Sequence, residues 1–137
     1  MSAATIETIR IQTSDGLHVA CDVLGRSGSR RPVIFLHGGG QTRHSWGSTA
    51  SQVAVNGHPC WSVDLRGHGE SDWAPDGDYS TEAMVEDLGA ILTQIGRPPV
   101  LVGASMGGLV GLMSEGKLRP GGLWGLVLVD VATQLEA

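Results

Sequence analysis

The chain opens with two stretches in which apolar and polar residues alternate. Ile9 and Ile11 set the alternation in the first stretch, residues 17–23 continue it in the second, and Asp15 and Gly16 lie between them. A period of two places one face of a strand against a core, and an Asp-Gly pair favours a tight hairpin turn. We therefore predict a β-hairpin at the start of the chain.

Downstream, short apolar runs alternate with longer segments of helical periodicity. Continuous apolar runs of this length are typical of strands buried on both faces. We predict strands at 33–36, 60–63, 100–102 and 124–129, helices at 46–56, 81–95 and 106–118, and a long loop at 64–79. Strands that alternate with helices predict an α/β fold, a mostly parallel sheet with the initial hairpin and with helices on both faces.

The final apolar strand bears on how the domain is organised. The 137 residues have room for one domain, and they contain no internal repeat. A sheet that ended at residues 126–129 would expose an apolar edge strand, which favours pairing with another chain. We therefore expect residues 1–137 to form a single incomplete core domain. Its open edge would pair with a missing C-terminal segment or with a second copy.

Composition and charge narrow the function classes. The net charge of −5 offers no basic face for phosphates, so nucleic acid is not an expected partner. Cys21 and Cys60 lie far apart without a CxxC spacing, so we expect reduced core cysteines and no metal site. The sequence shows no secretory signal and no apolar run of about 20 residues, and nothing in it calls for a cofactor. A cytoplasmic protein without membrane contacts is expected.

The chemistry centres on Ser105, in the segment Gly103-Ala104-Ser105-Met106-Gly107. This segment fits G-x-S-x-G, with a predicted buried strand before it and a predicted helix after it, as in a nucleophile elbow. Larger side chains two residues away from the serine would collide in so sharp a turn. The alternative is a glycine-rich nucleotide-binding turn, but the sequence spells neither G-x-G-x-x-G nor a P-loop.

A second glycine-rich segment, residues 37–40, directly follows the first predicted buried strand. Glycines let a loop turn its backbone N–H groups toward the oxyanion of a tetrahedral intermediate. We interpret the segment as an oxyanion loop, and the alternative is a loop without a chemical role.

With these motifs, the sequence resembles the α/β-hydrolase superfamily, and within it the cap-bearing esterases and cofactor-free haloperoxidase-like enzymes. The motifs that carry the resemblance are Phe35-Leu36-His37-Gly38-Gly39, Asp64-Leu65-Arg66-Gly67-His68-Gly69-Glu70-Ser71-Asp72, Gly103-Ala104-Ser105-Met106-Gly107-Gly108 and Val127-Leu128-Val129-Asp130. The resemblance implies that Ser105 is the nucleophile. It also implies that the N–H groups of Met106 and Gly39 form the oxyanion hole, with Gly40 the less favoured donor.

The histidine of a catalytic triad is not identified by this comparison. The superfamily orders its triad as Ser, acid and His, and no histidine follows Ser105 in this sequence. We expect His37 to be a buried structural residue, and His44 and His68 to be exposed. Asp130 lies where a minority of the superfamily places the acid; the alternatives are a structural aspartate here and an acid beyond the end of the chain.

Three functions remain open from the sequence. The first is a serine hydrolase that acts on a small ester or similar acyl substrate and is active only when a C-terminal segment completes it. The second is a cofactor-free perhydrolase or haloperoxidase-like enzyme with the same triad. The third is an inactive fragment that serves as a binding or assembly module.

Overall fold

The predicted hairpin forms one side of the sheet in the computed structural model, which describes residues 4–131. Strands β1 (Ile6–Gln12) and β2 (His18–Leu24) pair antiparallel, with Ile9 opposite Cys21. Gly16 adopts a φ of 89°, and its N–H donates to the carbonyl of Thr13 at 3.0 Å. The Asp-Gly pair thus makes the tight turn that its composition predicts.

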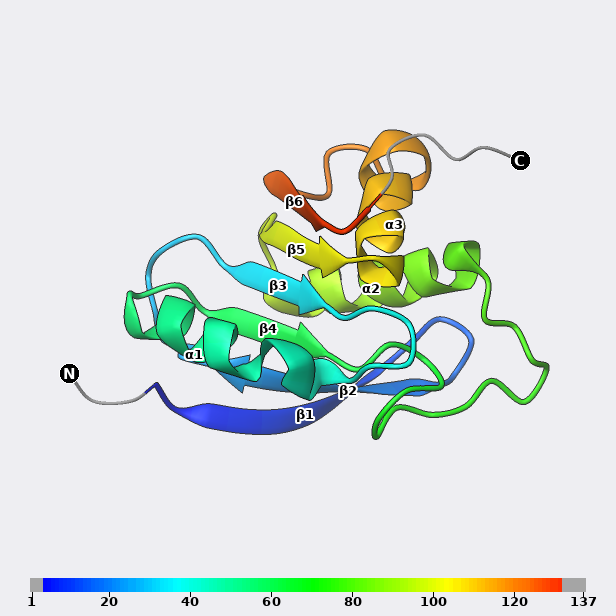
Figure 1. The fold of residues 1–137 in the computed structure, drawn as a ribbon, viewed down its shortest axis with the longest axis horizontal. Coiled ribbons are helices and arrows are strands. Elements are labelled where there is room, and N and C mark those ends of the chain that lie inside the picture. The colour runs from blue at the N-terminus through cyan, green and yellow to red at the C-terminus, as the bar shows by residue number, and fades with distance from the viewer. Residues whose placement is uncertain (1–3, 132–137) are drawn as a thin grey trace.

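The other strands extend the hairpin into a mostly parallel sheet. They are β3 (Val33–Leu36), β4 (Cys60–Val63), β5 (Val100–Ala104) and β6 (Gly125–Val129). The strand order is β1-β2-β4-β3-β5-β6, and β4, β3, β5 and β6 run parallel to one another (Figure 1). The predicted α/β class, with an initial hairpin on a parallel sheet, is confirmed.

Helices cover both faces of this sheet, as predicted. Helix α1 (Gly47–Val55) packs on one face, and α2 (Thr81–Ile95) and α3 (Met106–Met113) pack together on the other (Figure 1). The sheet side chains divide accordingly into two buried clusters, with Phe35 against α1 and Ile34 against α2 and α3. This division explains why β3 is apolar at every position.

Helix α2 begins and ends where its sequence predicts. The Ser80 hydroxyl accepts a hydrogen bond from the N–H of Ala83 at 3.2 Å, which caps the amino end. Gly96 adopts a φ of 84°, and its N–H donates to the carbonyl of Leu92 at 3.0 Å.

The predicted ends of other elements were wrong by a few residues. A 3₁₀ turn, η1 (Arg43–Trp46), precedes α1, because the side chain of Thr42 caps it. Helix α3 ends earlier than predicted and continues as a π-helical turn, η2 (Ser114–Leu118). The N–H of Arg119 donates to the carbonyl of Ser114 at 2.7 Å, so the turn closes one residue later than an α-helix would.

Strand β6 is the outer strand of the described sheet. Among residues 4–131 it pairs with β5 alone, and Val127 and Val129 are 48 % and 38 % exposed. The predicted apolar edge is therefore present, whereas the predicted domain limits at Met1 and Ala137 lie outside the described residues. No helix in the described range combines the length and apolar character needed to cross a bilayer.

Candidate active site

Ser105 lies at the turn between β5 and α3, with a backbone conformation that few residues adopt. Its φ is 49° and its ψ is −111°, and the residue is exposed. A non-glycine residue at positive φ costs on the order of 1–3 kcal/mol and persists only where the surroundings hold it. The turn thus presents the Ser105 hydroxyl to solvent at the carboxyl end of β5.

The glycines on either side of Ser105 are required by close packing. A Cβ on Gly103 would lie 2.6 Å from the carbonyl oxygen of Gly107. A Cβ on Gly107 would lie 2.5 Å from the carbonyl oxygen of Leu36, at the end of β3. Both distances are shorter than any real Cβ contact, so the predicted collision is confirmed and the turn packs directly against β3.

The same packing brings the predicted oxyanion loop next to the elbow. The N–H of Gly107 donates to the carbonyl of His37 at 3.2 Å, which joins the start of α3 to the end of β3. A Cβ on Gly39 would lie 3.9 Å from the sulfur of Met106. The structure therefore brings Gly39 and Met106 together, directly beside Ser105.

Three N–H groups of this loop have fixed acceptors. The N–H of Gly38 donates to the side-chain oxygen of Gln41 at 3.0 Å, and the N–H of Gln41 donates to the carbonyl of Gly38 at 3.1 Å. The N–H of Gly40 donates to Nε2 of His68 at 3.1 Å. Within residues 4–131, the N–H groups of Gly39 and Met106 have no acceptor.

His37 is a buried structural residue, as expected from the sequence. Its Nδ1 lies 2.8 Å from the carbonyl of Gly38, and its Nε2 accepts a hydrogen bond from the N–H of Leu65 at 3.0 Å. These partners select the neutral imidazole with the proton on Nδ1. Burial lowers the pKa of His37, and the neighbouring His68 acts in the same direction. Both ring nitrogens of His37 thus have backbone partners, which join the loop after β3 to the loop after β4.

His68 differs from the sequence-based expectation, which placed it as an exposed residue. It is half-buried, and its ring lies against the ring of His37 with a centroid distance of 4.9 Å. The hydrogen bond from Gly40 and the packing against His37 could not be predicted, because they join loops 28 residues apart in sequence.

The remaining histidines lie away from the elbow or face solvent. His44 is exposed, as expected, and Nδ1 of His58 lies 2.8 Å from the carbonyl of Arg31. Nδ1 of His18 lies 3.6 Å from a carboxylate oxygen of Asp72. In the described part of the chain, no imidazole forms a hydrogen bond with Ser105.

An ion-pair network centred on the buried side chains of Arg43 and Asp64, which sequence reasoning missed, fixes the loop between β3 and η1. Nη1 of Arg43 lies 2.5 Å from a carboxylate oxygen of Asp64, and Nη2 lies 2.6 Å from Glu70. The other Asp64 oxygen accepts from the N–H of Arg43 at 2.6 Å. Asp64 directly follows β4, so this network ties the loop beyond β4 to the loop beyond β3.

A second buried guanidinium supports the same loop from the other side. Arg66 donates through Nε and Nη2 to the two carboxylate oxygens of Asp87, at 2.7 and 2.6 Å. Both side chains are at most 2 % exposed. The carboxylates of Asp87 and Asp15 raise the pKa of Arg66 above its ordinary value and keep it charged. The two guanidinium groups thus hold residues 64–72 in place by buried hydrogen bonds.

Asp130 follows β6, the neighbour of β5 in the sheet. Its φ of 53° makes it the second non-glycine residue with positive φ in the described range, and it is exposed. The N–H of Ser105 donates to the carbonyl of Val129 at 2.9 Å, which places the start of the Asp130 turn beside the elbow. The carboxylate has no hydrogen-bond partner within residues 4–131.

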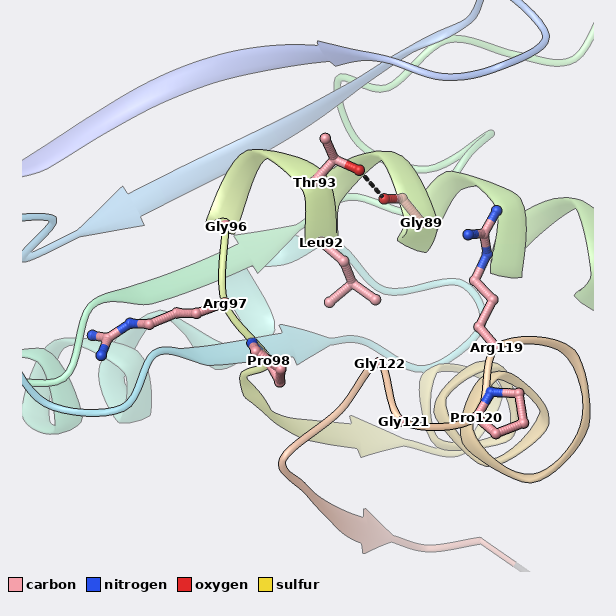
Figure 2. Close-up of a pocket in the computed structure, with 10 residues that line it drawn as sticks. All are labelled: Gly89, Leu92, Thr93, Gly96, Arg97, Pro98, Arg119, Pro120, Gly121 and Gly122. Carbon is pink, nitrogen blue, oxygen red and sulfur yellow. Dashed lines mark hydrogen bonds between the residues drawn. The ribbon is translucent and has the colours of Figure 1, made fainter.

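A surface hollow of about 640 Å³ lies at the opposite ends of the strands. Its walls come from the second half of α2, from Arg97 and Pro98 before β5, and from residues 119–122 before β6 (Figure 2). Figure 2 shows the side chains of Arg97 and Arg119 pointing away from each other. They bond to the carbonyl of Arg30 and to Glu86, so they form no joint anion site.

The two cysteines are free and buried, as the sequence predicts. Burial raises the pKa of the Cys60 thiol to about 12 and raises that of Cys21 as well, so neither is an activated nucleophile. The described residues contain no group of three or more histidine, cysteine or acidic side chains placed to hold a metal ion.

Comparisons with known proteins identify the family of the chain. Residues 31–119 match the family described as the alpha/beta hydrolase fold. The chain is 40 % identical over 113 residues to the esterase Rv0045c of Mycobacterium tuberculosis, and 36 % identical over 112 residues to protein phosphatase methylesterase 1 of Bos taurus. These alignments cover 82 % and 77 % of the chain, and 37 % and 30 % of the two relatives.

A solved structure shares this fold. An alpha/beta hydrolase from Novosphingobium aromaticivorans superposes with a TM-score of 0.83 at 29 % identity. The superposition covers 93 % of this chain and 45 % of that one. The chain therefore spans less than half the length of these three proteins.

Proposed function

The chain belongs to the α/β-hydrolase family, and on that premise we propose that it is a serine hydrolase that uses Ser105 to cleave an ester or a similar acyl substrate. One observation carries this proposal. Ser105 is exposed at a φ of 49° in a turn that only the glycines at 103 and 107 permit. A strained, exposed serine between a buried strand and a helix is the arrangement of a nucleophile elbow.

The proposed reaction has two steps. Oγ of Ser105 attacks the carbonyl carbon of the substrate, the bond to the leaving alcohol breaks, and the alcohol departs with a proton. Water then attacks the acyl-enzyme, which releases the carboxylic acid and restores the Ser105 hydroxyl. A small ester as the substrate is supported by the names of the relatives, an esterase and a methylesterase.

The oxyanion of each tetrahedral intermediate would be held by the N–H groups of Gly39 and Met106. Both groups lack an acceptor among the described residues, and the two residues lie next to each other beside Ser105. Met106 is also the first residue of α3, whose amino end carries a partial positive charge. Gly40 is the weaker candidate, because its N–H already donates to His68.

The proposal requires a base that residues 4–131 do not place at Ser105. We propose that a histidine from a further C-terminal segment completes the site, with Asp130 as one candidate for the acid that orients it. A site that retains only its oxyanion hole and binding contacts keeps roughly 10³–10⁴-fold acceleration over water. The 137-residue chain is therefore expected to react slowly by itself.

Supplying the missing base as free imidazole tests this proposal. The 137-residue chain would be incubated with a fluorophosphonate probe, with and without imidazole, and the labelled residue identified by mass spectrometry. We expect slow labelling of Ser105 that imidazole accelerates, because the added ring takes the proton from Oγ.

Ser105→Ala and Ser51→Ala serve as the matched controls. Labelling should disappear in the first variant and remain unchanged in the second, because Ser51 lies on α1 away from the elbow. Labelling spread over several serines, or a rate that Ser105→Ala leaves unchanged, would refute Ser105 as the nucleophile.

A further inference from the structure

His68 has a hydrogen-bonding arrangement that fixes its protonation state. Its Nδ1 lies 3.0 Å from the carbonyl oxygen of Arg66, and its Nε2 lies 3.1 Å from the backbone nitrogen of Gly40. The carbonyl can only accept, so Nδ1 carries the proton, and the lone pair of Nε2 accepts from the Gly40 N–H. A neutral imidazole thus serves as a bridge between two backbone groups.

The position of this imidazole is itself held firmly. The N–H of His68 donates to the carbonyl of Leu65 at 3.0 Å, and its ring lies against that of His37. Arg66, two residues before His68, is anchored in turn, because its guanidinium donates to the carboxylate of Asp87 on α2. His68 is therefore a rigid acceptor, held by Leu65, Arg66 and the ring of His37 as well as by its bond to Gly40.

The bond to Gly40 fixes one of the two peptides that flank Gly39. The Gly39 N–H belongs to the other peptide, whose Gly38 carbonyl accepts from the N–H of Gln41 and lies 2.8 Å from Nδ1 of His37. Gln41 takes the N–H of Gly38 and His68 takes the N–H of Gly40, so both neighbours of Gly39 are fixed in orientation. The peptide between Gly39 and Gly40 cannot rotate without breaking the contact to His68. The Gly39 N–H is left without an acceptor in the described part of the chain, next to Met106.

We propose that His68 is a positioning residue for the oxyanion hole. By accepting the Gly40 N–H, it holds the loop in the conformation that turns the Gly39 N–H toward the reacting carbonyl at Ser105. The inference rests on the proposed serine-hydrolase function. His68 acts through Gly40 and does not serve as the base, because its Nε2 lone pair is already occupied.

Two variants separate this role from a general effect on folding. In His68→Gln the side-chain oxygen reaches the position of Nε2 and can still accept from Gly40. In His68→Asn the shorter amide reaches only the position of Nδ1, so it keeps the bond to Arg66 and loses the bond to Gly40. Each variant therefore keeps one of the two hydrogen bonds of His68, and only His68→Gln keeps the one to Gly40.

The first readout is direct and independent of catalysis. In ¹⁵N-labelled chain, NMR should detect a scalar coupling across the hydrogen bond between the Gly40 amide and Nε2 of His68. The second readout is the rate of Ser105 labelling by the fluorophosphonate, at one fixed imidazole concentration. We expect His68→Asn to slow labelling by up to about 100-fold, the effect of misplacing a group by about 1 Å, and His68→Gln to recover most of the rate.

The outcomes distinguish the two proposals. A missing coupling in the parent chain, or labelling of His68→Asn at the parent rate, would overturn the role of His68 and leave the serine-hydrolase proposal intact. A clear coupling with no labelling of Ser105 in the parent chain would overturn the proposed function, and the role of His68 with it. Equal slowing in both variants would show a general structural effect and would also overturn the inference.

Discussion

Gly107 lies so close to Leu36 that a Cβ on the glycine would be 2.5 Å from the leucine carbonyl oxygen. Through this contact the amino end of α3 packs against the carboxyl end of β3. It fixes the distance between the turn that bears Ser105 and the loop that bears Gly39. The relative placement of the two predicted motifs therefore depends on the absence of one side chain.

Gly107→Ala should destabilise the fold by about 1–3 kcal/mol, because backbone atoms must move to admit the new methyl group. The matched control is Gly116→Ala, at an exposed helical position where a Cβ meets nothing within 4 Å. That change should be neutral or stabilise the chain by up to about 1 kcal/mol, since glycine is a poor helix former. Urea unfolding of both variants measures the difference, and equal effects would contradict the packing argument.

Removing the carboxylate of Asp87 should be among the most damaging single changes. It would leave the buried guanidinium of Arg66 with the half-exposed carboxylate of Asp15 in place of its buried partner, and breaking a buried pair costs about 3–5 kcal/mol. Glu86 is the neighbouring control, because it pairs with Arg119 at the surface, where ion pairs contribute about 0–1 kcal/mol. In thermal unfolding, Asp87→Ala should have a clearly lower midpoint temperature than Glu86→Ala. A similar loss of stability in both variants would show that the buried ion pair contributes no more than the surface one.

Acid should destabilise the chain partly through His37. Folding lowers the pKa of this imidazole, so the unfolded chain binds a proton more readily than the folded one. Its contribution to stability is complete above the unfolded pKa of about 6.5, and it declines as the pH falls from there toward the lowered folded value. The free energy of unfolding, measured by urea between pH 7.5 and 5, should therefore fall with decreasing pH.

His37→Gln should make this pH dependence shallower, because glutamine does not titrate and its amide can still donate and accept. His44→Gln should leave the slope unchanged, since His44 is exposed. An unaltered slope in His37→Gln would assign the acid sensitivity to other groups.

The outer edge of β6 should make the 137-residue chain self-associate. Val127 and Val129 are substantially exposed on a strand that pairs on one side only among the described residues. Val127→Lys should raise the concentration at which association begins, as light scattering would show. Thr49→Lys, which adds the same charge on α1, should have no such effect. A chain that stays monomeric without the substitution would contradict this expectation.

The sequence by itself determined the order of the elements and the two motifs. Periodicity identifies the hairpin and α2, because alternation and helical spacing reflect burial on one face. The elbow around Ser105 follows from its glycines, which are needed for steric reasons that act within a few residues. Such local constraints are visible in a single chain without knowledge of its partners.

Only the tertiary structure decided how these parts combine. The contacts of His68 with Gly40, of Arg66 with Asp87 and of Gly107 with Leu36 join residues 21 or more positions apart. From the sequence, polar side chains in a glycine-rich loop are expected to be exposed. Whether they are buried depends on which distant backbone groups lie beside them, and the sequence does not show this. The resemblance already favours Gly39 over Gly40 as the oxyanion donor. The fold supplies the reason, because it brings acceptors to the N–H groups of Gly38 and Gly40.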